Sequence, residues 1–214
     1  MRKAAILLWV LPHLIFSQVT TDEIIDKAIS YHDPNGKWDQ LKTRLIFTGI
    51  RPEGPERFAT IDFDNAAAFM KINRNNEEIY EVIGDEAKVV AGGKDEARAL
   101  MLRNYYLYLW GLPMKLKDKS TPTLQRMNDE EVKGVKCYVV RVAYQSDIWY
   151  FHFDMESGRM IQYKFYKDEE AGKGELITLE DEVLVDGIRM PKKRNWYTLP
   201  EMKFLGTDIL TKSE

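Results

Sequence analysis

The residues of this sequence that could do chemistry include two groups of neighbouring carboxylates. Asp62 and Asp64 could share a cation, although an aspartate followed by an asparagine, as at 64–65, is also typical of a plain turn. The acidic run 180–182 interrupts an apolar strand and places Asp181 on the face of its apolar neighbours. These carboxylates could form an acid–base pair. A β-bulge or a charged edge strand is the alternative interpretation.

Histidine, a frequent general base, occurs twice after residue 17. His32 is expected at the end of a helix, where a cation suits the helix dipole, and His152 on the polar, solvent-facing side of a strand. The sequence contains neither a His-Glu-x-x-His motif nor a Gly-x-Ser-x-Gly motif. A hydrolase built around Asp181 or His152 is therefore the least supported class of function, and we expect no enzymatic activity.

The glycine-rich segments do not match nucleotide-binding loops. Segment 92–94, Gly-Gly-Lys, is followed by aspartate where a phosphate-binding loop has serine or threonine. Gly172 and Gly174 lack the third glycine of a dinucleotide loop and precede a strand. Cys137 is the single cysteine and lies in an apolar run, so we expect it to be buried and to form neither a disulfide nor a zinc site. No cofactor and no metal are expected.

The densest basic run is 192–194, Lys-Lys-Arg, close to Trp196. It could meet an anionic head group, and a solvated strand edge is the alternative. The whole chain has 31 basic and 34 acidic residues, a formal charge of 31 − 34 = −3. Because an acidic chain has no excess positive charge to neutralise phosphates, nucleic acid is not expected as a partner.

The first 17 residues have the proportions of a secretory signal peptide. Arg2 and Lys3 precede a mostly apolar run at 4–16, which is shorter than the roughly 20 apolar residues of a membrane-spanning helix. No cysteine lies near the expected cleavage point, so no lipid anchor is expected. No later run is long and apolar enough to span a membrane. The chain from residue 18 onward is expected to be periplasmic or secreted.

Hydrophobic periodicity indicates the elements that position these residues. Segments 20–32 and 95–110 have the period of a helix, and the first begins with a capping box between Thr20 and Glu23. About nine or ten segments alternate with the period of a strand and are separated by turn signals such as Asp-Gly at 186–187.

This order predicts an α+β fold over residues 18–214, in one domain. Strands joined by tight turns form an antiparallel meander, and a twisted meander curls into a half-barrel or a barrel. One face of the strands is rich in aromatic side chains, which must be covered by helices or by a bound molecule. We therefore expect the two helices to cover the concave face.

An apolar cavity inside this curved sheet is the first candidate for a binding site. Burying a twelve-carbon chain could contribute about 10 kcal/mol before ordering costs. The alternative is that the aromatic side chains pack on the helices and leave no space. The side chains expected to line the cavity are those of Trp38, Phe47, Trp110, Tyr138, Val140, Trp149, Phe151, Phe153, Ile161, Tyr163, Phe165 and Trp196.

Several short segments, in this order along the chain, carry a resemblance to a known group of proteins. They are Ala-Ile-Ser-Tyr-His at 28–32, Gly-Lys-Trp-Asp-Gln-Leu-Lys-Thr at 36–43, Tyr-Tyr-Leu-Tyr-Leu-Trp-Gly-Leu-Pro at 105–113, Asp-Gly-Ile-Arg-Met-Pro at 186–191, Trp-Tyr at 196–197 and Leu-Gly-Thr-Asp at 205–208. With the order of elements, they resemble the half-barrel superfamily of periplasmic lipoprotein carriers (LolA/LolB-like), and an uncharacterised secreted family within it.

The resemblance implies a half-barrel whose apolar cavity, lidded by helices, binds acyl chains. No residue matches the carriers' lid-opening arginine; Arg44 lies in the first strand without supporting context. The expected absence of a lipid anchor favours the soluble branch of the superfamily.

Three classes of function follow from these patterns. The first is a non-enzymatic extracytoplasmic binding protein for a hydrophobic small molecule or a lipoprotein acyl chain. The second is a structural or interaction module of the cell envelope, with a filled core and an envelope protein as partner. The third, a hydrolase, has the least support.

Overall fold

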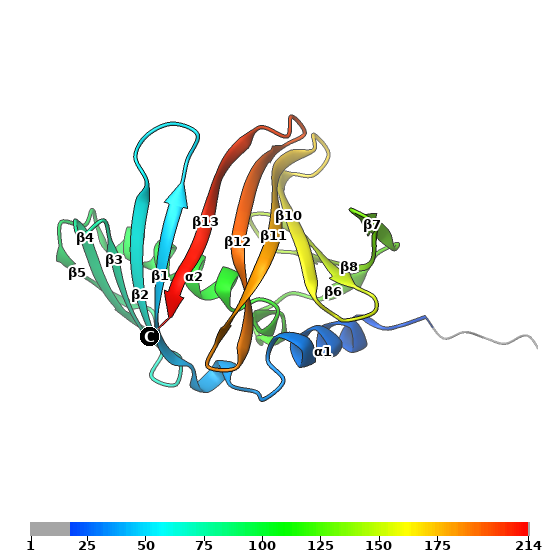
Figure 1. Cartoon of the computed structure of the whole chain (residues 1–214), viewed down its shortest axis with the longest axis horizontal. Helices are drawn as coiled ribbons and strands as arrows, with labels where there is room; N and C mark the ends of the chain where they lie inside the picture. The colour runs from blue at the N-terminus through cyan, green and yellow to red at the C-terminus, as the bar shows by residue number, and fades with distance from the viewer. Residues whose placement is uncertain (1–17, 214) are drawn as a thin grey trace, which may run out of the picture.

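The structure, a computed structural model, describes residues 18–213, so the expected signal peptide at 1–17 lies outside the described residues. Figure 1 shows a long curved sheet with one helix behind it and one beneath it. The α-helices of the described chain are α1 (Thr21–His32) and α2 (Glu96–Trp110), and the short 3₁₀ turns are η1 (Trp38–Gln40) and η2 (Met114–Lys117). The strands are β1 (Lys42–Ile50), β2 (Arg57–Asp64), β3 (Phe69–Arg74), β4 (Glu78–Ile83), β5 (Glu86–Ala91), β6 (Leu124–Arg126), β7 (Glu130–Val132), β8 (Val135–Ala143), β9 (Ile148–Asp154), β10 (Met160–Asp168), β11 (Lys173–Val185), β12 (Ile188–Leu199) and β13 (Phe204–Ser213).

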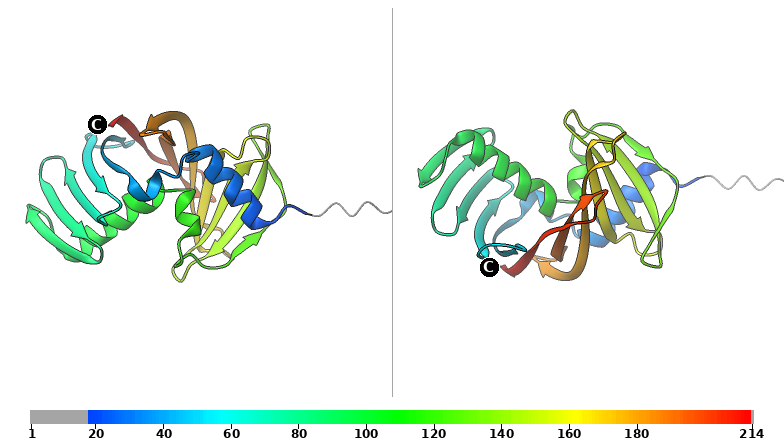
Figure 2. Two further views of the ribbon diagram at one scale, coloured as in Figure 1. Left: turned by 90° about the horizontal axis from the view of Figure 1, so that it is seen from below. Right: turned by 90° about the horizontal axis from the view of Figure 1, so that it is seen from above.

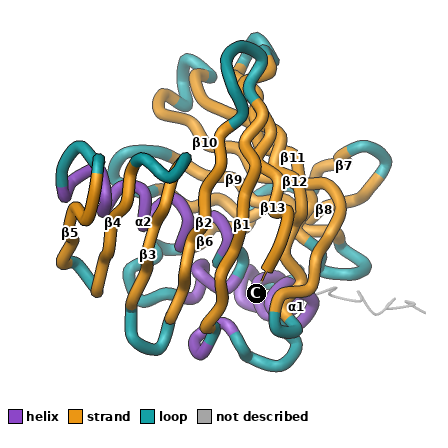
Figure 3. The backbone as a smooth tube through the Cα atoms, turned by 60° about the vertical axis from the view of Figure 1, so that its left-hand side comes forward, coloured by secondary structure: helices purple, strands orange, loops and turns teal. Residues whose placement is uncertain are grey.

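All thirteen strands belong to one sheet, in the order β5-β4-β3-β2-β1-β13-β12-β11-β10-β9-β8-β6, with β7 pairing to β8. Every neighbouring pair is antiparallel. The end strands β5 and β6 do not pair, so the sheet is an open half-barrel (Figure 3). This confirms the α+β curved antiparallel fold and decides between the half-barrel and the closed barrel.

Local chemistry explains how the longest hairpin forms. Asp186 and Gly187 connect β11 to β12 with φ angles of 49° and 87°, which a two-residue turn with a right-handed twist requires. The register Val185↔Ile188 then fixes which side chains of both strands face the concave side.

The two helices begin at the expected caps and have different positions. In α1, the Thr20 side chain and Glu23 form the capping box, and in α2 the Asp95 side chain accepts a bond from the Arg98 amide. Helix α2 lies along the concave side of the β1–β5 half of the sheet (Figure 2). Helix α1 lies beneath the sheet and contacts β6 and β12 (Figure 1).

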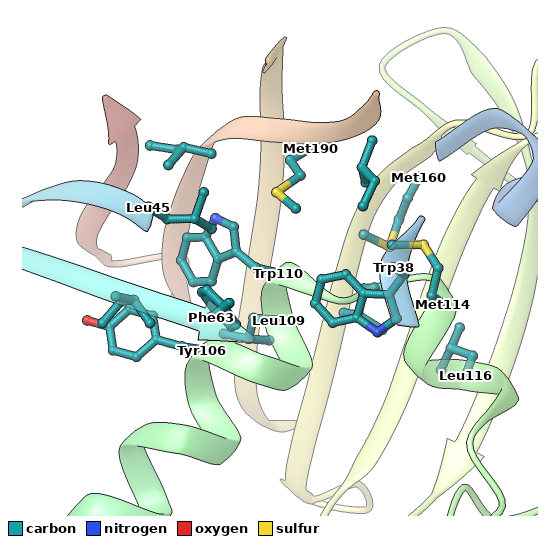
Figure 4. Close-up of a cluster of buried hydrophobic side chains, with 14 of the residues drawn as sticks. Trp38, Leu45, Phe63, Tyr106, Leu109, Trp110, Met114, Leu116, Met160 and Met190 are labelled. Atoms are coloured by element: carbon teal, nitrogen blue, oxygen red, sulfur yellow. The ribbon is translucent and has the colours of Figure 1, made fainter. Parts of the chain in front are cut away.

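The core beneath the C-terminal end of α2 is filled. Trp110 is 1% exposed, and its ring centroid lies 4.5 Å from that of Phe47 in β1. Trp38, Met114 and Met160 belong to the same apolar cluster as Trp110 (Figure 4). Packing of this kind is what the filled-core alternative predicts for this part of the molecule.

Arg194 is fully buried, so the expectation of a solvated strand edge is wrong at this residue. Its guanidinium lies 3.9 Å from the ring centroid of Trp110, and its Nη2 donates to the Leu109 carbonyl over 2.8 Å. Leu109 is in the last turn of α2, where carbonyls lack helical partners and the dipole favours a cation. Lys193, on the opposite face, pairs with Asp181 at 2.9 Å.

His32 ends α1, as expected, but both histidines are completely buried. The prediction that His152 faces solvent is therefore wrong. The Nδ1 of His32 lies 2.7 Å from the Arg189 carbonyl, and its Nε2 accepts a bond from the Met160 amide over 3.1 Å. His32 therefore ties α1 to β10 and β12 instead of capping the helix as a cation. His152 Nε2 lies 2.9 Å from Glu130 Oε2. Glu130 comes from β7, a strand too short to be predicted, and this contact removes His152 from solvent.

Candidate binding groove

A cavity of about 820 Å³, here called the aromatic groove, lies between α2 and strands β9 to β12 of the sheet. It is lined by residues of α2, of the β8–β9 connection and of four strands. They are Met101, Asn104, Tyr105, Tyr108, Leu109, Tyr144, Ser146, Asp147, Trp149, Phe165, Lys167, Glu175 and Trp196. Its volume is within the range of small-molecule sites.

The wall of the groove is a stack of aromatic rings. Trp149 stacks on Phe165 with ring centroids 4.8 Å apart and on Phe151 at 5.9 Å. Tyr108 of α2 contacts Trp149 edge to face at 5.5 Å, and its hydroxyl bonds the Tyr144 hydroxyl over 2.7 Å. Burial, followed by the neighbouring Tyr144, raises the pKa of Tyr108 well above its usual value, so the groove wall is neutral here.

A second cavity of about 240 Å³, here called the arginine pocket, adjoins the groove. The two cavities share Met101 and Tyr105 of α2. A hollow of about 220 Å³ beside Tyr105 adjoins both, since Arg51 also lines the pocket and Trp196 also lines the groove. The arginine pocket is lined by Phe47, Gly49, Arg51, Arg57, Phe58, Ala59, Arg74, Arg98, Met101, Leu102, Tyr105, Tyr106, Trp110 and Asp208.

Asp208 of β13 forms hydrogen bonds with residues that line both cavities. Its carboxylate accepts bonds from the Tyr105 hydroxyl over 2.6 Å, from Trp196 Nε1 over 2.9 Å and from Arg51 Nη2 over 2.9 Å. Burial, reinforced by the charge of Asp208, raises the pKa of Tyr105 well above its usual value. Tyr105 therefore stays a neutral donor, and its ring stacks on Trp196 at 6.0 Å.

The residues expected to line one cavity are distributed over several places. Trp149, Phe165 and Trp196 line the aromatic groove, and Phe47 and Trp110 line the arginine pocket. Trp38 lines a separate cavity of about 410 Å³ next to η1.

The other six are parts of the wall or the core. Val140, Phe151, Phe153 and Tyr163 are fully buried members of the core cluster, and Tyr138 is half-buried against it. Ile161 lies at a β-bulge between Met160 and Gln162, and Met160 takes the buried position opposite Phe153. Of these residues, Phe151 and Tyr163 support the groove wall, with ring centroids 5.9 and 5.7 Å from that of Trp149.

Apart from Trp110, sequence reasoning did not assign the cavity-lining residues of α2 or the arginines to a site. Tyr105 and Tyr108 are three residues apart on one helix, a spacing that places them on one face, and this signal could have been used. Arg51, Arg57 and Arg74 lie in different segments, and only the pairing of β1, β2 and β3 brings them together.

The candidate carboxylates do not converge on one site. Asp62 pairs with Arg44, Asp64 with Lys42 and Asp181 with Lys193, each at 2.9 Å or less. Asp181 has a positive φ of 53° inside β11. The register of β11 with β12 is nevertheless continuous from Gly174 to Val185, so β11 has no bulge at Asp181 and the bulge interpretation is wrong. Within residues 18–213, no three His, Cys, Asp or Glu side chains gather so that they could hold a metal ion.

Solved structures with the same architecture define the class of fold. One is a LolA superfamily protein from Nitrosomonas europaea, with 11% identity, a TM-score of 0.59 and coverage of 92% of this chain and 94% of that chain. Another is an outer membrane lipoprotein-sorting protein domain from Vibrio parahaemolyticus, with 9% identity, a TM-score of 0.58 and coverage of 90% of both chains. A third is a DUF1329 family protein from Desulfovibrio piger, with 10% identity, a TM-score of 0.55 and coverage of 90% and 92%.

The chain thus has the LolA-like half-barrel fold, as the sequence resemblance implied. It belongs to the family of unknown function DUF6503, which matches residues 5–213. No curated protein matches the sequence. In the described part of the chain, neither α1 nor α2 has the length and apolar composition of a membrane-spanning helix.

Proposed function

We propose that this protein is a non-enzymatic extracytoplasmic binding protein that shelters a lipid or another acyl-bearing ligand in the aromatic groove. The observation that carries the proposal is the groove itself, a cavity of about 820 Å³ walled by Trp149, Phe165 and Trp196. Aromatic and apolar walls favour an apolar ligand, because each methylene removed from water contributes about 0.8 kcal/mol.

The LolA-like neighbours, one of which is a lipoprotein-sorting domain, support the same class of function. A shared fold does not transfer a ligand. The periplasmic or secreted location, the cleavable signal peptide and the acyl-chain ligand are therefore parts of the proposal.

A bulky side chain in the groove tests the proposal. Asn104 is exposed, lies on α2 and lines the groove, so Asn104→Trp should occupy space needed by a ligand without disturbing the core. We expect native mass spectrometry after incubation with a lipid extract to show a retained lipid on the wild-type protein and at least about tenfold less on N104W.

Ala97→Trp is the matched control, because Ala97 is exposed on the same helix and is not among the residues lining the groove. It should retain lipid like the wild type. Absence of lipid from the wild-type protein, or equal retention by N104W, would refute the proposal.

The filled core beneath α2 favours a second candidate, an envelope interaction module. Phe47 and Trp110 leave little space at that end of the sheet. Under this candidate, the wild-type protein retains no lipid and instead co-purifies with an envelope protein.

A further inference from the structure

We propose that the arginine pocket binds the anionic head of an amphiphile, a phosphate or a carboxylate, while its apolar chain lies in the aromatic groove. This inference rests on the proposed function and specifies the ligand as an anionic amphiphile. The charges that line the pocket and its position beside the aromatic groove support it.

The pocket concentrates positive charge in a chain that is acidic overall. Four guanidinium groups line it, whereas the carboxylates paired with them are those of Asp208 and Glu78, so the formal local charge is 4 − 2 = +2. The chain as a whole has a formal charge of −3. A local excess of the opposite sign attracts an anion to this place.

The carboxylates present leave donor capacity for a ligand. Arg51 binds Asp208, which already accepts from Tyr105 and Trp196. Arg74 and Arg98 share one oxygen of Glu78, at 2.9 and 3.7 Å. Each guanidinium has five N–H donors in a planar fork that fits phosphate and carboxylate oxygens.

Arg57 has no carboxylate partner within the described residues, although it lines the pocket. The side chains of Arg51, Arg74 and Arg98 are 24%, 18% and 32% exposed, so their charges are partly desolvated and bind an anion more strongly than surface charges do. Arg98 has a structural role, because its ion pair with Glu78 of β4 connects α2 to the sheet. Arg57 has no such ion pair within the described residues.

Gly49 of β1 allows the close approach of the charged side chains that line the pocket. A Cβ atom at this position would stand 3.3 Å from Asp208 Oδ1, 3.5 Å from Arg57 Cβ and 3.6 Å from Arg51 Nη1. The missing side chain therefore lets Asp208, Arg51 and Arg57 approach one another closely at this point, and the space left for an anion is the pocket itself, of about 240 Å³.

The connection between the cavities gives the ligand its direction. The hollow beside Tyr105 shares Arg51 with the arginine pocket and Trp196 with the aromatic groove, so it lies next to both. The groove carries Asp147 and Glu175 against one lysine, Lys167, so it repels an anion. An anionic head is thus directed toward the arginines and an apolar chain toward the rings.

Four probes of defined chemistry test this inference by isothermal titration calorimetry. Dodecyl phosphate should bind at least about tenfold more tightly than dodecanol or dodecyltrimethylammonium, and inorganic phosphate alone should bind more weakly than dodecyl phosphate. Arg57→Gln and Arg98→Gln should each weaken dodecyl phosphate binding about tenfold and leave dodecanol binding unchanged. Arg159→Gln removes the same charge from an exposed residue outside the pocket and should change neither affinity.

The outcomes separate this inference from the proposed function. If dodecanol binds as tightly as dodecyl phosphate, or if R57Q has no effect, the arginine pocket does not bind an anionic head group. Either result leaves the proposal of an apolar ligand in the aromatic groove unaffected. Inorganic phosphate binding as tightly as dodecyl phosphate shows a free-anion site and overturns the amphiphile. If none of the dodecyl probes binds, both proposals fail. Because Arg57 is exposed and has no ion pair in the described chain, R57Q should fold like the wild type.

Discussion

At the scale of single residues, buried polar side chains connect the elements around the groove. His32 joins α1 to β10 and β12 through both ring nitrogens, and Arg194 joins β12 to the end of α2. Burial lowers the pKa of His32, and the bond to the Arg189 carbonyl opposes this only in part. Burial also lowers the pKa of His152, with Glu130 opposing. Both rings are therefore neutral in the folded protein at pH 7.

These two lowered pKa values predict that the protein loses stability in mild acid. Below the ordinary histidine pKa of about 6.5, the unfolded chain binds protons that the folded chain does not, so the free energy of unfolding falls as the pH drops. At pH 5.5 the loss is up to about 1.4 kcal/mol for each histidine. Urea unfolding at pH 7.5 and 5.5 measures it.

His32→Gln separates the contribution of His32. The variant should be less stable than the wild type at pH 7.5 and should lose less stability between pH 7.5 and 5.5. Equal stability of the wild-type protein at both pH values would contradict the neutral, buried histidines.

Alternation in the strands explains which site residues could be predicted. Trp149 and Phe165 face the groove because a strand alternates its side chains and their positions in β9 and β10 share one face. Arg194 was assigned to solvent because a basic run is usually solvated, and the helix end that compensates its charge comes from residues 85 positions away. The arginine pocket could not be predicted either, since it depends on the register of three strands.

At the scale of elements, helix α2 decides which part of the half-barrel is filled and which is open. Its C-terminal end packs Trp110 into the core, while Tyr105 and Tyr108 form one wall of the groove. The helix could be predicted from its period and from its Asp95 cap. The strands β6 and β7 could not, because three residues are too few to show alternation.

The cap of α2 makes a testable contribution to stability. The Asp95 side chain accepts a bond from the Arg98 amide over 2.8 Å, so Asp95→Ala should lower the free energy of unfolding by about 1 kcal/mol. Asp95→Asn keeps the acceptor and should cost much less. Urea unfolding of the two variants measures both losses in the free energy of unfolding. Equal losses would show that the side-chain cap does not cause the destabilisation.

At the scale of the whole molecule, the open sheet provides a curved wall whose edge strands, β5 and β6, do not pair, and α2 covers one half of it (Figure 2). The half-barrel could be predicted from the meander and the aromatic face. The division of the concavity into a filled part, a groove and a charged pocket could not, because it depends on where α2 lies across the sheet.

Quenching of tryptophan fluorescence by 12-bromododecanoic acid tests most directly whether the groove holds an acyl chain. Trp149 lines the groove and Trp38 lines a separate cavity. We predict saturable quenching of the wild-type protein, a reduced quenched fraction in Trp149→Phe, in which Trp196 is the groove tryptophan that remains, and an undiminished quenched signal in Trp38→Phe. Absence of saturable quenching, or the same quenched fraction in W149F as in the wild type, would contradict an acyl chain in the aromatic groove.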